Sequence, residues 1–147
     1  MNKLIFKLLK IEDAQSIFDN REFVVSYFNG GISKKDFNSW KLEDEIKYTE
    51  REIEDVKKGI KVTYLIFNNN EYIGRCMLHG INNKNKSAEV SVSIKEKFWG
   101  QSYGTKAVKH LEKLAFTKFK LNRLEYGSYS NNERSKKLAE KLGFKYE

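Results

Sequence analysis

The spacing of the apolar residues changes along the chain, and this change constrains the fold more than any other sequence feature. Residues 62–67 (VTYLIF), 72–78 and 88–94 (AEVSVSI) are β-rich, and the last segment alternates polar and apolar positions as a strand does. Residues 103–119 instead repeat with helical spacing. The apolar face of that helix consists of Ala107, Val108, Leu111, Leu114, Ala115 and Phe119. Both periods in one short chain predict a mixed α/β fold.

Weaker patterns extend this plan in both directions. The further predicted elements are a strand over residues 4–9, helices over 11–19 and 42–58, a strand over 123–129 and a helix over 132–142. Gly59 and Gly143 directly follow predicted helices, at the position where a left-handed residue often ends a helix. Asn132 suits the N-cap of the last helix. The expected order is β-α-α-β-β-β-α-β-α in a single domain of residues 1–147.

Composition excludes several classes of protein. With 39% hydrophobic and 33% charged residues over 147 positions, the chain has the content of one globular domain rather than of a disordered segment. No stretch approaches the roughly 20 apolar residues of a membrane span, and the first residues lack a signal-peptide pattern. The single cysteine, Cys76, excludes an internal disulfide and a cysteine-rich zinc site. We expect a soluble cytoplasmic protein without a metal centre or membrane contact, with Cys76 in the core.

The positive charge lies in the C-terminal third. Residues 95–147 carry 13 Lys+Arg against 6 Asp+Glu, a net charge of +7, whereas the whole chain has a net charge of +8. Such a basic segment attracts a nucleic acid, an acidic protein or a phosphate-rich cofactor. Solvated helix faces explain the same charge without any partner. Nucleic acid is the weaker interpretation, because the aromatic residues of this segment fall on predicted core faces rather than between lysines on a strand.

The loop between strand 88–94 and helix 103–119 contains two glycines. Gly100 and Gly104 allow a tight turn and a close approach of backbone N–H groups to a ligand. The loop opens a helix, whose N-terminus presents unpaired donors and a partial positive charge to an anion. A pyrophosphate fits this pattern, and so does a purely structural turn.

Three motifs around this loop form a family pattern. Strand 88–94 is followed by W-G-x-x-x-G-T, an amphipathic helix and strand 123–129, and then by N-x-x-S, a helix and L-G-F. This arrangement over residues 87–147 resembles the acetyl-CoA-binding half of the GNAT superfamily of N-acetyltransferases. Within that superfamily it is most similar to the branch that acetylates the N-termini of ribosomal proteins. The implied fold is a GNAT-like mixed sheet with a splayed parallel strand pair.

The resemblance implies acetyl-CoA as co-substrate, bound where strands 88–94 and 123–129 part. The backbone of Val92, Ser93 and Ile94 would pair with the pantetheine arm, which Asn132 would also contact. Ser135 would lie near the sulfur and protonate the departing thiolate, because Ala139 replaces the tyrosine that many family members use. The pyrophosphate would lie against Trp99, Gly100, Gln101, Ser102, Tyr103, Gly104 and Thr105.

Two departures from the family pattern stand out. Ser102 replaces the central glycine of the phosphate loop, which is expected to weaken the approach of the loop to phosphate. Family members also continue past the G-F pair for two more strands, so the resemblance implies a C-terminally short domain. Strand 123–129 would then be an exposed edge, open to a second copy of the chain in a homodimer.

Glu89 is the candidate general base. Alternation along the strand places Glu89, Ser91 and Ser93 on one face, where Glu89 would act on the acceptor amine through water. An ion pair with a neighbouring lysine or arginine is an equally good interpretation of Glu89. His79 and His110 lack a partner carboxylate at useful spacing, and we expect His110 to be an exposed helix residue.

Two segments bear on the acceptor. Tyr27, Phe28, Phe37 and Trp40 would line its pocket, or form an ordinary apolar cluster. The charged helix over 42–58, with Ile46, Ile53 and Val56 as its apolar stripe, is expected to be largely exposed. Its acidic residues would guide a cationic substrate or be merely solvated.

The predicted function is transfer of an acetyl group from acetyl-CoA to a primary amine by direct attack. The resemblance to the ribosomal-protein branch implies a protein N-terminal α-amino group as the first candidate acceptor. Such a group titrates near 7.7–8.0, against about 10.4 for lysine, so it needs only a weaker base. The alternatives are a polyamine, aminoglycoside or amino sugar as acceptor, or a catalytically impaired acetyl-CoA-binding remnant.

Overall fold

A computed structural model describes residues 3–21, 39–126, 137 and 139–144. Its five strands form one sheet in the order β1-β2-β3-β4-β5. The strands are β1 (Leu4–Leu8), β2 (Val62–Asn68), β3 (Glu71–Asn82), β4 (Ser87–Ile94) and β5 (Arg123–Tyr126). The first four pair antiparallel in chain order, and β5 lies parallel to β4. The predicted α/β fold with a parallel strand pair is confirmed.

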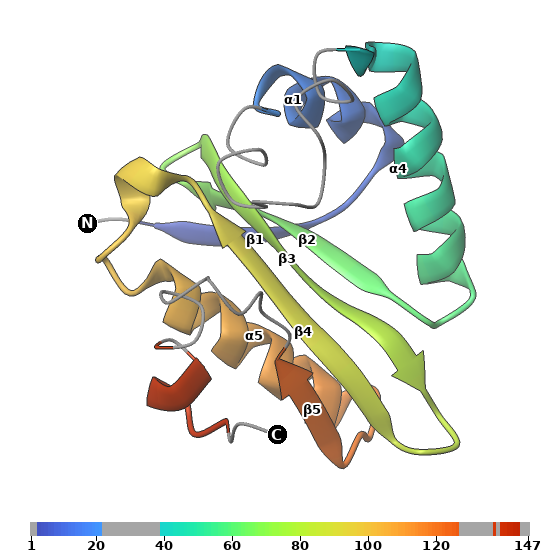
Figure 1. The fold of residues 1–147 in the computed structure, drawn as a ribbon, viewed down its shortest axis with the longest axis vertical. Helices are drawn as coiled ribbons and strands as arrows, with labels where there is room; N and C mark the ends of the chain where they lie inside the picture. The colour runs from blue at the N-terminus through green and yellow to red at the C-terminus, as the bar shows by residue number, and fades with distance from the viewer. Residues whose placement is uncertain (1–2, 22–38, 127–136, 138, 145–147) are drawn as a thin grey trace.

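Helices cover both faces of the sheet (Figure 1). A short 3-10 turn, η1 (Ile11–Asp13), leads into α1 (Ala14–Asp19), which packs with α4 (Leu42–Lys57) on one face. Helix α5 (Tyr103–Thr117) covers the other face and contacts β3 and β4. Because α5 is the crossover between the parallel strands β4 and β5, its N-terminus lies near the end of β4. This connection brings the glycine loop to the sheet.

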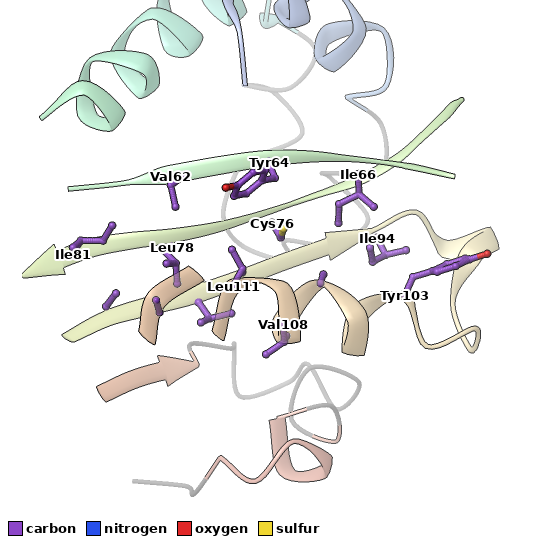
Figure 2. Close-up of a cluster of buried hydrophobic side chains, with 14 of the residues drawn as sticks. Val62, Tyr64, Ile66, Cys76, Leu78, Ile81, Ile94, Tyr103, Val108 and Leu111 are labelled. Atoms are coloured by element: carbon purple, nitrogen blue, oxygen red, sulfur yellow. The ribbon is translucent and has the colours of Figure 1, made fainter. Parts of the chain in front are cut away.

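The main core lies between the sheet and α5 (Figure 2). Alternate residues of the central strands point into it, among them Val62 and Tyr64 of β2, and Cys76 and Leu78 of β3. Val108 and Leu111 of α5 are completely buried against them. A smaller apolar cluster on the opposite face consists of Leu9, Ile17, Leu65 and Tyr72. The α5 side therefore anchors the fold and leaves polar residues of β3 and β4 on the other face.

Most predicted elements are confirmed, with different ends. Strand β3 runs from Glu71 to Asn82, four residues beyond the end of the β-rich segment over residues 72–78. Gly59 and Gly143 have the expected positive φ, +76° and +90°. Most of the predicted helix over 132–142, and the predicted strand beyond Tyr126, lie outside the described residues.

Candidate active site

Within the described residues, only the first half of strand β4 is paired with its parallel neighbour β5. The β4–β5 register runs from Ser87 opposite Arg123 to Val90 opposite Tyr126. Beyond that pair, β4 continues to Ile94 with β3 on its other side. Within the described residues, the second half of β4 therefore presents one edge that is not paired with β5.

The backbone of Val92 faces this edge. The Lys95 N–H donates to Ile73 O on β3 at 2.8 Å, so the odd-numbered residues at the end of β4 direct their backbone groups toward β3. Backbone groups of successive strand residues alternate in direction, so those of Val92 and Ile94 point toward the β5 side. Consistent with this direction, Ile94 O accepts a hydrogen bond from the indole Nε1–H of Trp99 at 2.8 Å.

The loop after β4 folds back onto the strand and then starts α5. A 3-10 turn, η2 (Glu96–Phe98), precedes Trp99, whose bond to Ile94 fixes the loop against the strand. Gly100 has φ +78° and is exposed. Ser102 is the N-cap residue of α5 with φ +65° and ψ 16°, the left-handed region that glycine favours. The serine noted as a departure from the family pattern thus occupies a position that suits glycine.

The N-terminus of α5 suits an anion. Its first turn contains no acidic residue, and the Ser102 side chain makes no capping hydrogen bond to it. By contrast, Glu43, Asp44 and Glu45 already fill the first turn of α4 with negative charge. Gly104, Thr105 and the exposed Lys106 belong to the first turns of α5. Since a helix N-terminus carries a partial positive charge, these N–H groups and the lysine favour a phosphate group.

Glu89, Ser91 and Ser93 share the face of the sheet opposite α5, as alternation predicted. His79 of β3 lies directly opposite Glu89 in the register. Its Nε2 is 2.8 Å from Ser91 Oγ, and its Nδ1 is 3.9 Å from Glu89 Oε2. The expectation that His79 lacks a partner carboxylate was therefore wrong. The pairing depends on the register of β3 and β4, which sequence spacing did not provide.

A buried ion pair lies farther along the same face. The Arg75 guanidinium donates from Nη2 to both carboxylate oxygens of Glu52 at 2.7 Å. The Thr63 hydroxyl donates to Glu52 Oε2 at 2.6 Å, and Lys61 Nζ lies 3.3 Å from the same oxygen. Burial opposes ionisation of Glu52, but Arg75, Thr63 and Lys61 outweigh it and hold the pKa of this carboxyl below its usual value.

Helix α4 is consequently less exposed than its charge suggested. Its most buried residues are Glu45, Thr49 and Glu52, whereas Ile53 and Val56 of the expected apolar stripe are only partly buried. Glu45 accepts a hydrogen bond from Trp40 Nε1 at 2.7 Å, and burial raises its pKa. The buried stripe is polar because it faces Arg75 and Thr63 on the sheet.

His110 is also placed differently from expectation. Its ring stacks on Phe6 at 4.2 Å and meets the edge of Tyr64 at 4.7 Å, so it is a half-buried packing residue and not an exposed one. Burial lowers its pKa. The signal was available, since residue 110 follows Ala107 by three positions and precedes Leu114 by four on the buried face.

Cys76 is a core residue as expected, fully buried with the pKa of its thiol raised by burial to about 12. Asn132, Ser135, Tyr27, Phe28 and Phe37 lie outside the described residues. Among the residues that are described, no group of three or more His, Cys, Asp or Glu side chains is arranged to hold a metal ion. No helix in that part of the chain has the length and apolar content needed to cross a membrane.

The chain belongs to the acetyltransferase (GNAT) domain family, whose model matches residues 3–145. It is thus an acyl-CoA-dependent N-acetyltransferase by family.

Individual relatives agree with this membership. The uncharacterized N-acetyltransferase YoaA of Bacillus subtilis is 24% identical over 150 residues, covering 99% of this chain and 81% of YoaA. A structure of RimL, a ribosomal L7/L12 α-N-protein acetyltransferase, in complex with coenzyme A superposes with a TM-score of 0.84 at 19% identity, over 98% of this chain and 81% of RimL. A spermidine N-acetyltransferase chimera of Vibrio cholerae SpeG and hSSAT superposes with a TM-score of 0.76 at 16% identity. The match covers 98% of this chain and 81% of the chimera. These structures show the same fold.

Proposed function

We propose that this protein transfers the acetyl group of acetyl-CoA to the α-amino group of a protein N-terminus. The observation that carries the proposal is the end of β4. There a strand edge beyond the last described β5 pair leads into the glycine-bearing loop and the N-terminus of α5, and the polar face of the same strand carries Glu89 and Ser91. The similarity to RimL supports the choice of acceptor.

Acetyl-CoA would lie along this edge. The backbone groups of Val92 and Ile94 point to the β5 side, where the Val92 N–H would stabilise the oxyanion formed at the thioester carbonyl. The backbone of Ser93 is directed toward β3, so the expectation that it pairs with the pantetheine arm was wrong and only Val92 and Ile94 keep that role. The pyrophosphate would contact the loop from Trp99 to Thr105. Asn132 is assigned to the pantetheine arm.

The proposed reaction is direct attack of the amine on the thioester. Holding both reactants at the end of β4 makes the attack effectively intramolecular. Glu89, 43% exposed, would draw the proton from the amine through water, and Ser135 would donate a proton to the departing thiolate. Direct transfer also fits the burial of Cys76, whose thiol stays protonated and inaccessible at neutral pH.

The test is acetylation of short peptides with a free N-terminus, measured with acetyl-CoA. We expect Glu89→Gln to lower kcat by about 100-fold, the scale of general base catalysis, with an unchanged KM for acetyl-CoA. Glu125→Gln is the matched control, because Glu125 lies opposite Glu89 on β5 and is exposed. Equal activity of both variants would exclude Glu89 as the base.

A polyamine is the second candidate acceptor, supported by the likeness to the spermidine N-acetyltransferase chimera. Spermidine and N-terminally blocked peptides containing lysine provide the comparison. A higher kcat/KM for spermidine than for any free N-terminus would replace the first acceptor with this one.

A further inference from the structure

His79 lies close to two polar residues of β4, one that is paired with β5 and one just beyond the last described β5 pair. Glu89 belongs to the paired part of β4, opposite Glu125, whereas Ser91 lies just beyond the last described pair. The His79 ring reaches Ser91 Oγ with Nε2, at 2.8 Å, and faces Glu89 Oε2 with Nδ1, at 3.9 Å. The three side chains therefore form a polar row that runs from Ser91, just beyond the last described β5 pair, back toward Glu89.

This row is open to solvent at the Glu89 end. The side chains of His79 and Glu89 are 32% and 43% exposed. The distance from Nδ1 to Oε2 exceeds a hydrogen bond, so transfer of a proton between these two exposed groups needs a bridging water molecule. A proton that reaches the imidazole can consequently leave to bulk water.

Among the other charged groups on this face, Arg75 lies four positions away on β3 and is paired with Glu52. On the β2 side, the register ends at Val62 opposite Leu78, and Lys61, the residue before Val62, is paired with Glu52 of α4. On the far side of Glu89 lies Glu125, which contacts Arg123 at 3.3 Å. Glu89 is therefore the carboxylate directly opposite the ring in the register.

We infer that His79 accepts the proton of the acceptor amine through the Ser91 hydroxyl and passes it through water to Glu89, from which it is released to solvent. This inference rests on the proposed function, and it supplies the link between the amine and Glu89. The ammonium N–H bond breaks as its proton passes to Ser91 Oγ, while the Ser91 hydroxyl proton passes to Nε2. The products are a neutral amine, an unchanged serine and an imidazolium, whose Nδ1 proton then moves through water to the Glu89 carboxylate and on to solvent.

The chemistry of the three groups suits this relay. In the tautomer protonated on Nδ1, Nε2 accepts from the Ser91 hydroxyl while the Nδ1–H faces Glu89. Imidazole is the side chain that ordinarily exchanges protons near neutral pH. An α-amino group, which titrates near 7.7–8.0, gives up its proton to such a base at little cost.

The experiment compares His79→Gln and Ser91→Ala with His110→Gln, using acetyl-CoA and a free-N-terminus peptide that the unmodified protein acetylates. His110 is the matched control because it is the other histidine of the chain and packs against Phe6 and Tyr64 on the α5 face. We expect His79→Gln to lower kcat about 100-fold at pH 7 with unchanged acetyl-CoA KM, and His110→Gln to leave kcat unchanged. Thermal unfolding of each variant is followed in parallel.

Two readouts separate proton transfer from a structural role. The deficit of His79→Gln shrinks toward pH 9, because the amine then loses its proton to solvent. Added imidazole restores part of the activity of His79→Ala. A His79→Gln variant with full activity, or a deficit that neither pH nor imidazole changes, overturns the relay and leaves the proposed function standing. Failure of the unmodified protein to acetylate any amine from bound acetyl-CoA overturns both.

Discussion

A side chain on Gly74 would occupy the space of the Ser93 backbone carbonyl. A Cβ placed on Gly74 would lie 2.1 Å from Ser93 O and 3.0 Å from Ile94 Cα. Both contacts are with backbone, which cannot move without shifting β4. The close approach of β3 to the end of β4, and so the position of the proposed thioester site, depends on a glycine here.

Gly74→Ala is therefore expected to lower the free energy of unfolding by about 1–3 kcal/mol, the range of overpacked interiors. It should also weaken acetyl-CoA binding, since β4 must shift. Gly80→Ala on the same strand is the control: a Cβ there has no atom within 4 Å, and only its positive φ of +57° opposes the change. Denaturant unfolding and calorimetric titration measure the two effects. Undiminished acetyl-CoA binding by Gly74→Ala would show that the site does not depend on this approach.

Ser102→Gly should stabilise the protein. Ser102 has φ +65°, a conformation that costs an L-residue about 1 kcal/mol and glycine much less. Lys120→Gly, at φ +54° in the turn after α5, is expected to give a similar gain. Acetyl-CoA affinity should hold or rise in Ser102→Gly and stay constant in Lys120→Gly. A loss of affinity in Ser102→Gly would mean that the serine hydroxyl itself contacts the cofactor.

Trp99→Phe removes the indole donor that Ile94 O accepts at 2.8 Å while keeping an aromatic ring in the loop. Loss of one such bond is worth about 1 kcal/mol, so we expect roughly fivefold weaker acetyl-CoA binding. Trp40→Phe is matched to it, because Trp40 also donates from Nε1, to Glu45 at 2.7 Å. That variant should lose stability but keep its acetyl-CoA affinity. Equal affinities in both variants would contradict the assigned role of Trp99.

The two buried carboxylates of α4 should respond oppositely to neutralisation. Glu52→Gln breaks the pair with Arg75 and leaves a buried cation, at a cost of about 3 kcal/mol at pH 7. Because the pKa of Glu52 is lowered in the folded state, its stabilisation is present above the ordinary carboxyl pKa and is lost as pH falls through the lower folded value.

Glu45→Gln should instead be neutral or stabilising at pH 7. Burial raises the pKa of Glu45, so its ionisation opposes folding above that pKa, and the penalty disappears in acid. Gln retains an oxygen that can accept from Trp40. Urea unfolding at pH 7 and pH 4 distinguishes the variants, and destabilisation of similar size in both would refute the difference between the two sites.

The helices and strands could be predicted from the sequence because the spacing of their apolar residues is regular. The alternation of β4 and the apolar face of α5 are local properties, and the glycines at 59 and 143 mark helix ends directly. The loop after β4 was predicted for the same reason, since Gly100 has a positive φ that its residue type signals.

Contacts between distant strands were not available from sequence. A one-residue slip between β3 and β4 would move His79 to the other face, so its place opposite Glu89 depends on register. The Glu52–Arg75 pair joins residues 23 positions apart, and charge patterning alone described α4 as solvated. Such polar groups become buried only because partners from other elements satisfy them.

The most direct test of the account is isothermal titration of the purified chain with acetyl-CoA. The central claim is that the end of β4 and the N-terminus of α5 form the acetyl-CoA site. We predict one acetyl-CoA molecule bound per chain, with a dissociation constant on the order of 1–100 μM. Binding should weaken at higher salt, because the charges of the phosphates contribute to it. Absence of binding to the folded chain at millimolar acetyl-CoA would contradict the claim.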